Sequence, residues 1–305
     1  MNEAERSPVL VLGLAGVNWT ELVRRVSAKT LPGLSALLSP AAAGPLISHA
    51  PAIGPAGWTT LATGLQPVDH GLVTPDGPWA GGLRPAGAAS WHVPPLWSRL
   101  AAADMHTGSV GWPASSPGAS WPGDHVDDRF AISHGETWDD WAMPHSQTPA
   151  ALREDLRALR VHPHDVTGQM LLPFVPALAQ LDQSRNHGLV PLAVALAQLS
   201  TEHAAASALM GSARHDALFV QHDWLAEIER GYANAASPFE GVIDAAWTLL
   251  DQLIGQIASI ASARTLIIAG IGSGGQPGAV IIAGPGIAQG KIAGANLIDI
   301  APTIL

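Results

Sequence analysis

Histidine and carboxylate side chains gather at a few points of the sequence, where they could bind a metal ion. Because the chain has 13 histidines and no cysteine, any metal site must be built from His, Asp or Glu. His162 and His164 are separated by one residue, a spacing that would place both imidazoles on one face of a strand. Pro163 between them favours a loop or the start of a helix instead, so we do not expect this pair to bind a metal.

Two further groups combine side chains of the ligand type, and one more histidine lies apart from them. A segment rich in Gly, Pro, Trp and His contains Asp124, His125, Asp127, Asp128, His134, Glu136, Asp139 and Asp140, and this density is typical of a solvated loop with Asx turns. His222 and Asp223 follow an apolar run and are the best candidates for a relocated ligand pair, although a surface role is the expectation we favour. His70 lies in a turn and is predicted to be a hydrogen-bonded structural residue.

The composition excludes several functional classes. The chain has 305 residues with 25 acidic and 15 basic side chains, a formal net charge of −10, and no run of Lys or Arg, so nucleic acid is not an expected partner. The lack of cysteine excludes disulfides, thiolate nucleophiles and Fe–S clusters. The glycine-rich stretches 270–278 and 284–286 match neither the P-loop nor the dinucleotide fingerprint, and they are predicted to be turns at strand ends.

The elements that position these residues can be predicted from apolar patterns. Continuous apolar runs at 8–15, 107–112, 217–221, 265–269 and 279–283 predict strands that are buried on both faces of a sheet. Helical spacing of apolar residues is found at 19–28, 34–38, 95–103, 150–159, 189–207 and 238–262, and Pro302 fits the first turn of a helix. Because strands and helices alternate, we predict an α/β domain with a parallel sheet.

One domain is expected to cover residues 1–305, with a loop-rich and helical cap insertion within 73–210. Nine of the eleven tryptophans lie at or before Trp141, and we expect them to pack in the core and the cap. The N-terminus is acidic, and no uninterrupted apolar stretch approaches the roughly 20 residues of a membrane helix. A cytoplasmic protein without a membrane span is therefore expected.

Five groups of residues, in the same order and spacing, resemble the alkaline phosphatase superfamily in its branch of type I phosphodiesterases and nucleotide pyrophosphatases. They are VLVLGLAGVNW at 9–19 with LPGL at 31–34; PAIGPAGWTT at 51–60 with TGLQPVDHGL at 63–72; LWSRL at 96–100 with VGWPA at 110–114 and VDDRF at 126–130; residues 216–232; and AGPGI at 283–287 with IDIAPTIL at 298–305. The resemblance implies a three-layer α/β/α sandwich with a mostly parallel central sheet.

The resemblance also implies where a catalytic site would lie. Members of this family hydrolyse phosphate esters with two zinc-type ions that flank a Thr or Ser nucleophile, held by Asp and His side chains at the strand ends. In this sequence the first-strand Asp falls on Ala15, the nucleophile on Gly54, and the Asp-x-x-x-His pair on Ala226 and Arg230. The Asp-His-Gly stretch falls on Gly270, Ile271 and Gly272, and no Asp, Glu or His occurs between Arg264 and Lys291.

These replacements predict a vestigial site without metal or other cofactor. At an effective dielectric of about 20, a unit positive charge such as Arg230 placed about 4 Å from a divalent ion would cost about 8 kcal/mol. We therefore predict a catalytically inactive, phosphodiesterase-like homologue that acts as a structural or regulatory subunit and binds another protein.

Two alternatives remain open. The first is an active, metal-dependent phosphodiesterase or phosphatase with zinc or manganese held by relocated ligands, drawn from His222, Asp223 and the histidine-rich loops. The second is a small-ligand receptor, which requires a cavity lined by Ala15, Gly54 and Ala226.

Overall fold

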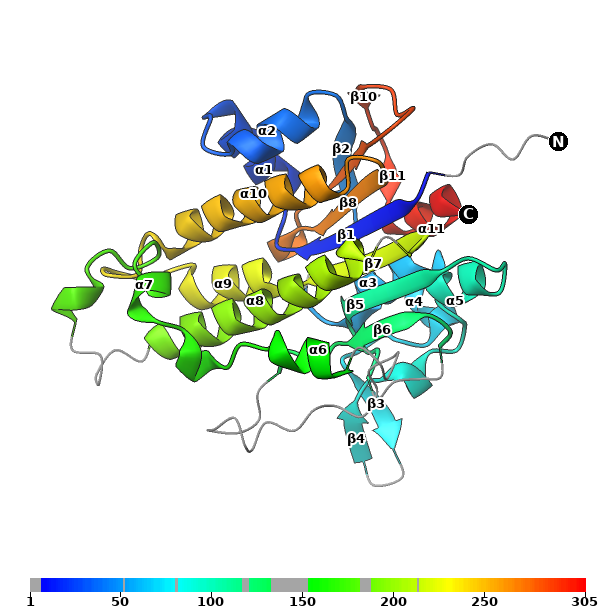
Figure 1. Ribbon diagram of the computed structural model, residues 1–305, viewed down its shortest axis with the longest axis horizontal. Helices are drawn as coiled ribbons and strands as arrows, with labels where there is room; N and C mark the ends of the chain where they lie inside the picture. The colour runs from blue at the N-terminus through cyan, green and yellow to red at the C-terminus, as the bar shows by residue number, and fades with distance from the viewer. Residues whose placement is uncertain are drawn as a thin grey trace.

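The computed structural model describes residues 7–51, 53–79, 82–116, 121–132, 153–181, 188–212 and 214–305. A central sheet has the strand order β10-β2-β9-β8-β1-β7-β5-β6, with β11 beside β2 (Figure 1). The strands are β1 (Val9–Ala15), β2 (Ala42–Ile47), β5 (Thr107–Trp112), β6 (Asp124–Asp127), β7 (Ala217–His222), β8 (Thr265–Ile271), β9 (Gly278–Ala283), β10 (Gly290–Lys291) and β11 (Ala295–Asn296). Only β9 pairs antiparallel to its neighbours, so the sheet is mostly parallel.

Helices cover both faces of this sheet (Figure 1). They are α1 (Trp19–Ser27), α2 (Pro32–Leu38), α3 (Pro55–Thr63), α4 (Pro67–His70), α5 (Leu96–Ala101), α6 (Arg153–Ala158), α7 (Gly168–Leu171), α8 (Leu189–Gly211), α9 (Trp224–Tyr232), α10 (Val242–Ile260) and α11 (Ile300–Ile304). One core cluster joins α1, α2, α8, α9 and α10 to one face, and a second joins α3, α5 and α11 to the other. The predicted three-layer α/β/α arrangement is confirmed.

The central strands form because their residues are apolar on both faces. Along β1, Leu10, Leu12 and Leu14 enter the cluster on the α8–α10 side, while Val11 and Ala15 enter the α3 side. The predicted strands at 107–112, 217–221, 265–269 and 279–283 are confirmed within one or two residues at their ends.

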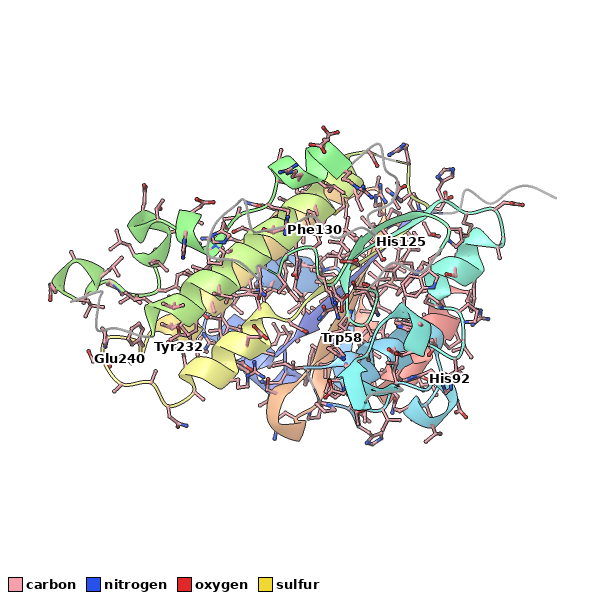
Figure 2. All side chains as sticks on the ribbon, turned by 90° about the horizontal axis from the view of Figure 1, so that it is seen from below. Trp58, His92, His125, Phe130, Tyr232 and Glu240 are labelled. Carbon is pink, nitrogen blue, oxygen red and sulfur yellow. The ribbon has the colours of Figure 1, made fainter. Side chains whose placement is uncertain are left out.

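Close packing of α3 against the sheet depends on one glycine. Trp58 of α3 is fully buried, inside the molecule in Figure 2. A Cβ built on Gly13 of β1 would lie 2.7 Å from the Trp58 ring, so only glycine permits this contact. Trp97, Trp112 and Trp247 are also fully buried, which confirms core packing for these tryptophans.

The prediction of a solvated loop over 124–128 is wrong, because residues Asp124–Asp127 form the edge strand β6. His125 and Asp127 are buried, and His125 Nδ1 lies 2.8 Å from Ser109 Oγ of β5. Asp124 Oδ2 lies 2.9 Å from His215 Nε2. The burial of His125 is offset by its partner on the neighbouring strand, and Asp127 accepts a 3.0 Å hydrogen bond from the Arg129 backbone N–H. His134, Glu136, Asp139 and Asp140 lie outside the described residues.

The predicted cap range of 73–210 contributes to the sandwich itself. It contains β5, β6 and α8, together with a short antiparallel hairpin of β3 (Asp76–Trp79) and β4 (Gly82–Pro85). The boundaries of a cap stay a prediction. No helix in the described part of the chain combines the length and apolar character needed to cross a membrane.

Candidate functional site

The carboxyl ends of three parallel strands meet at one edge of the sheet. Ala15, the last residue of β1, is paired with Ile271, the last residue of β8, and Leu14 is paired with His222 at the end of β7. In open α/β sheets, ligands bind at this edge. The helices α3 and α9 begin here, after Gly54 and Asp223.

A cavity of about 880 Å³ lies at this edge. It brings together three of the seven residues predicted for the vestigial site, namely Gly54, Ala226 and Arg230. The other four, Ala15, Gly270, Ile271 and Gly272, are buried and do not line the cavity. The cavity thus satisfies two of the three contacts required by the receptor alternative.

Gly54 has a backbone conformation that is special to glycine. Its φ is 110° and its ψ is 167°, a region occupied almost only by glycine. A Cβ placed on Gly54 would meet nothing within 4 Å, so space is available for a side chain. The backbone angles, and not crowding, disfavour any other residue at this position.

Two polar residues of the cavity, Glu229 and Ser273, were not identified from the sequence. Ser273 Oγ donates a hydrogen bond of 2.7 Å to Glu229 Oε2. Burial raises the pKa of the Glu229 carboxyl, and the bond from Ser273 opposes the rise. Helical spacing could have found Glu229, because positions three and four residues after Ala226 share its helix face.

Arg230 is the single cation among the described residues that line this cavity. Its Nη2 lies 3.4 Å from Glu227 Oε1, and its side chain is 66% exposed, so this surface pair is weak.

The side chains of His222 and Asp223 have different partners and do not form a ligand pair. His222 Nδ1 lies 2.8 Å from Glu202 Oε2 of α8, whereas Asp223 Oδ1 accepts a 2.6 Å hydrogen bond from Gln221 Nε2. His222 is buried, so the expected surface role is wrong for this residue. Its side chain follows Leu218 and Val220 toward the α8 side, because successive residues of a strand point to opposite faces.

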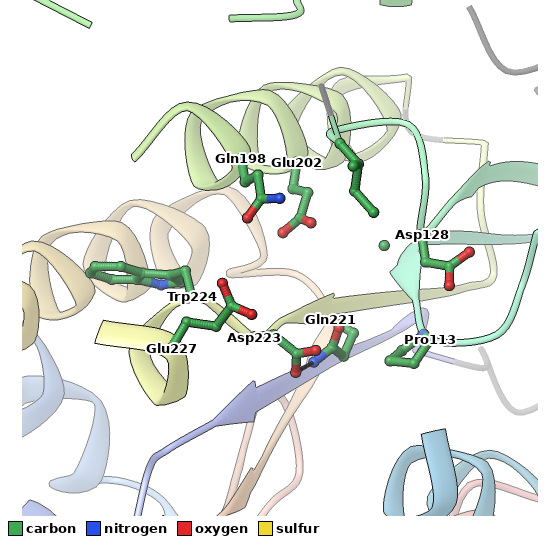
Figure 3. Close-up of a pocket in the computed structure, with 10 residues that line it drawn as sticks. Pro113, Asp128, Gln198, Glu202, Gln221, Asp223, Trp224 and Glu227 are labelled. Carbon is green, nitrogen blue, oxygen red and sulfur yellow. Dashed lines mark hydrogen bonds between the residues drawn. The ribbon is translucent and has the colours of Figure 1, made fainter. Parts of the chain in front are cut away.

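A second, smaller cavity of about 170 Å³ is lined by four acidic residues, one after β6, one on α8 and two at the start of α9 (Figure 3). They are Asp128, Glu202, Asp223 and Glu227. Burial raises the pKa of Asp128 to about 6 and the pKa of Asp223 to about 7, and it also raises the pKa of Glu227. The described residues contain no group of three or more His, Asp or Glu arranged to hold a metal ion.

The two remaining histidine predictions concern local structure. His70 is fully buried, with Nε2 3.0 Å from Thr60 Oγ1, and its Nδ1 accepts a hydrogen bond from the Leu72 backbone N–H, which confirms a structural role. His162 precedes a 3₁₀ helix at Pro163–Asp165, and its Nδ1 accepts a bond from the His164 N–H. The predicted helix entry is confirmed.

The sequence from the first to the last of the central parallel strands matches one protein family. A model of the type I phosphodiesterase / nucleotide pyrophosphatase family matches residues 9–268. This chain belongs to that family. A comparison with curated protein sequences gave no match.

Solved structures with the same fold include phosphonoacetate hydrolase from Sinorhizobium meliloti 1021, in complexes with phosphonoformate and with phosphonoacetate. Each has a TM-score of 0.51 and 13% sequence identity, and each match covers 87% of this chain. Murine ectonucleotide pyrophosphatase / phosphodiesterase 5 matches with a TM-score of 0.48 and 14% identity over 86% of this chain. The chain spans 56% of the length of these proteins. The two phosphonoacetate hydrolase matches thus show an alkaline phosphatase-like fold for this family member.

Proposed function

We propose that this member of the family is catalytically silent and acts by binding, as a structural or regulatory subunit beside another protein. The observation that carries the proposal is the conformation of Gly54. The resemblance places the nucleophile at this residue, which has no hydroxyl and whose backbone angles suit glycine almost alone. A threonine or serine there would require the turn before α3 to change.

The chemistry of the larger cavity supports the absence of a metal pair. Two zinc or manganese ions need several carboxylate or imidazole ligands to balance their charge. Among the described residues that line the cavity, Glu229 is the single carboxylate, and it is engaged by Ser273. Arg230 adds a positive charge at a position where the resemblance expects a ligand. These residues do not fit a pair of dications.

Two exposed apolar side chains, close in sequence to a residue of the cavity wall, support a protein partner. Val68 is 80% exposed and Val73 is 60% exposed, and Pro75, two residues further, lines the cavity. Val68 and Val73 thus offer apolar surface to a partner in the segment that leads to Pro75.

Metal content and hydrolysis test the silent site directly. The dialysed chain is expected to retain less than one zinc or manganese ion per molecule and to hydrolyse a nitrophenyl phosphodiester no faster than buffer, with either metal added. Two tightly bound ions per chain together with turnover would overturn the proposal and favour the alternative with relocated ligands. Loss of that turnover in Asp223→Asn would then identify the relocated site.

The partner is tested by affinity purification from the native host with matched variants. A partner that docks on the segment before Pro75 should be retained by the unmodified chain and lost when Val68 and Val73 are both changed to Asp. Val190→Asp is the control, because Val190 is 65% exposed on α8. Equal retention by all three proteins would contradict docking at this surface.

A further inference from the structure

We propose that the 880 Å³ cavity beside Gly54 binds a small amphipathic carboxylate, an apolar molecule with a single carboxylate that pairs with Arg230. The inference rests on the proposed function in one respect, since metal ions in the cavity would compete with Arg230 for any anion. It goes further by naming the chemical class of the occupant.

The walls of the cavity favour an apolar body. Six of its lining residues present carbon to the interior of the space, and they are Pro51, Ile53, Pro75, Ala226, Ala233 and Ile243. Small-molecule sites are mostly apolar with a few polar groups and have volumes of about 300–1,000 Å³. A volume of about 880 Å³ lies within that range.

Arg230 is available to bind an anion, in contrast to another arginine on the same side of the sheet. Arg25 of α1 is 9% exposed and is held by Glu21 and Asp244, each at 2.6 Å. Within the described part of the chain, the one ion pair of Arg230 is the 3.4 Å contact with Glu227, and its side chain remains 66% exposed. A guanidinium with free N–H groups matches the two oxygens of a carboxylate.

Glu229 limits the charge of the occupant. Its carboxylate lines the same cavity as Arg230 and is held by Ser273, so the cavity carries at most one net positive charge. A phosphate monoester carries about −1.5 to −2 charges at neutral pH and would be repelled more strongly by Glu229 than a carboxylate. The residues that line the cavity therefore favour a ligand with a single negative charge.

Three probes of nearly equal shape test the inference by isothermal titration calorimetry on the dialysed full chain. They are phenylbutyrate, phenylbutanol and phenylbutylamine, which differ in charge at one end. We expect phenylbutyrate to bind about tenfold more tightly than phenylbutanol, the effect of one charge-assisted hydrogen bond, and phenylbutylamine to bind most weakly. Equal affinities for the three probes, or no binding of phenylbutyrate, would overturn the inference.

Variants assign the effect to named residues. Arg230→Gln should lower the affinity for phenylbutyrate about tenfold to that of phenylbutanol, and Glu229→Gln should raise it severalfold. Ala233→Trp should abolish binding of all probes, because Ala233 lines the cavity and is exposed, so a larger side chain fills space without disturbing the core. Arg99→Gln is the control, an exposed arginine on α5 across the sheet.

A gain of affinity in Glu229→Gln cannot arise from misfolding, so the test does not depend on losses alone. Unchanged phenylbutyrate affinity in Arg230→Gln would overturn the inference. Metal content measured on the same samples separates the two proposals. A chain without metal that binds no carboxylate contradicts only this inference, whereas a chain with two bound ions contradicts the proposed function.

Discussion

Gly54 lies where the family resemblance expects a nucleophile, and its φ of 110° is a property of the backbone that a new side chain cannot correct. Gly54→Thr is therefore expected to lower the free energy of unfolding by about 1–3 kcal/mol. It should give no hydrolysis of a nitrophenyl phosphodiester with added zinc. Chemical denaturation and the hydrolysis assay measure the two effects.

A matched glycine separates backbone strain from a general effect of substitution. Gly255 lies inside α10 without a positive φ, and its added Cβ would meet its nearest neighbour at 3.9 Å. Gly255→Ala should raise stability by about 0.5–1 kcal/mol, because alanine favours the helix. An increase in stability for Gly54→Thr as well would show that the turn before α3 tolerates a side chain.

The carboxylate of Asp223 provides a prediction of pH dependence. Burial raises its pKa from 3.8 to about 7, so the folded chain holds a proton that the unfolded chain releases near pH 4. This contribution to stability is full below pH 4 and is lost as the pH rises toward 7. Relative to Asp223→Asn, the wild type should lose about 1.4 kcal/mol per pH unit between these values.

Other titrating groups make the comparison with the variant necessary. Asp128, with a pKa raised to about 6 by burial, changes stability in the same direction as Asp223. His70, with a pKa lowered to about 4 by burial, has the opposite effect, because its folded form resists protonation below pH 6.5. Both groups are present in wild type and variant and cancel in the difference. Parallel pH curves for the two proteins would show that Asp223 is ionised when folded.

At the scale of elements, α2 is held to α10 by one buried carboxylate. The N-cap residue of α2 makes no side-chain hydrogen bond to the helix. Instead, the backbone N–H groups of Gly33 and Leu34 donate hydrogen bonds to Asp251 Oδ2 and Oδ1, at 2.9 and 2.7 Å. Asp251→Ala leaves both donors without this acceptor and should cost about 3 kcal/mol of stability. Chemical denaturation measures this loss.

The isosteric variant tests whether hydrogen bonding by Asp251 is the cause. Asp251→Asn retains one oxygen acceptor and should destabilise the chain less than Asp251→Ala. Equal losses in the two variants would attribute the effect to removal of the charge.

The sheet shows which elements the sequence could predict. The central strands are apolar on both faces, and this local pattern is enough to identify them. The edge strand β6 was missed because its polar residues are typical of a loop. His125 is buried beside Ser109 of β5, and Asp124 is paired with His215, which is 91 residues away in the sequence.

At the scale of the whole molecule, the proposed silent site implies that metal does not stabilise the fold. A chelator should leave the melting temperature of the dialysed chain unchanged, and added zinc should not raise it, because a ligand stabilises only a folded state that it binds. Differential scanning calorimetry with and without the chelator measures this. A fall of several degrees on chelation would reveal a structural or catalytic metal.

The sequence by itself determined the α/β fold, the positions of the central strands β1, β5, β7, β8 and β9, and the residue types at Ala15, Gly54 and Ala226, because these depend on local patterns and residue types. Only the tertiary structure decided which residues face a cavity. Glu229 and Ser273 meet across 44 residues, and Asp128 and Glu202 come from two other segments to line one cavity with Asp223 and Glu227 at the start of α9. Such contacts arise from how the helices pack on the sheet, which no short stretch of sequence specifies.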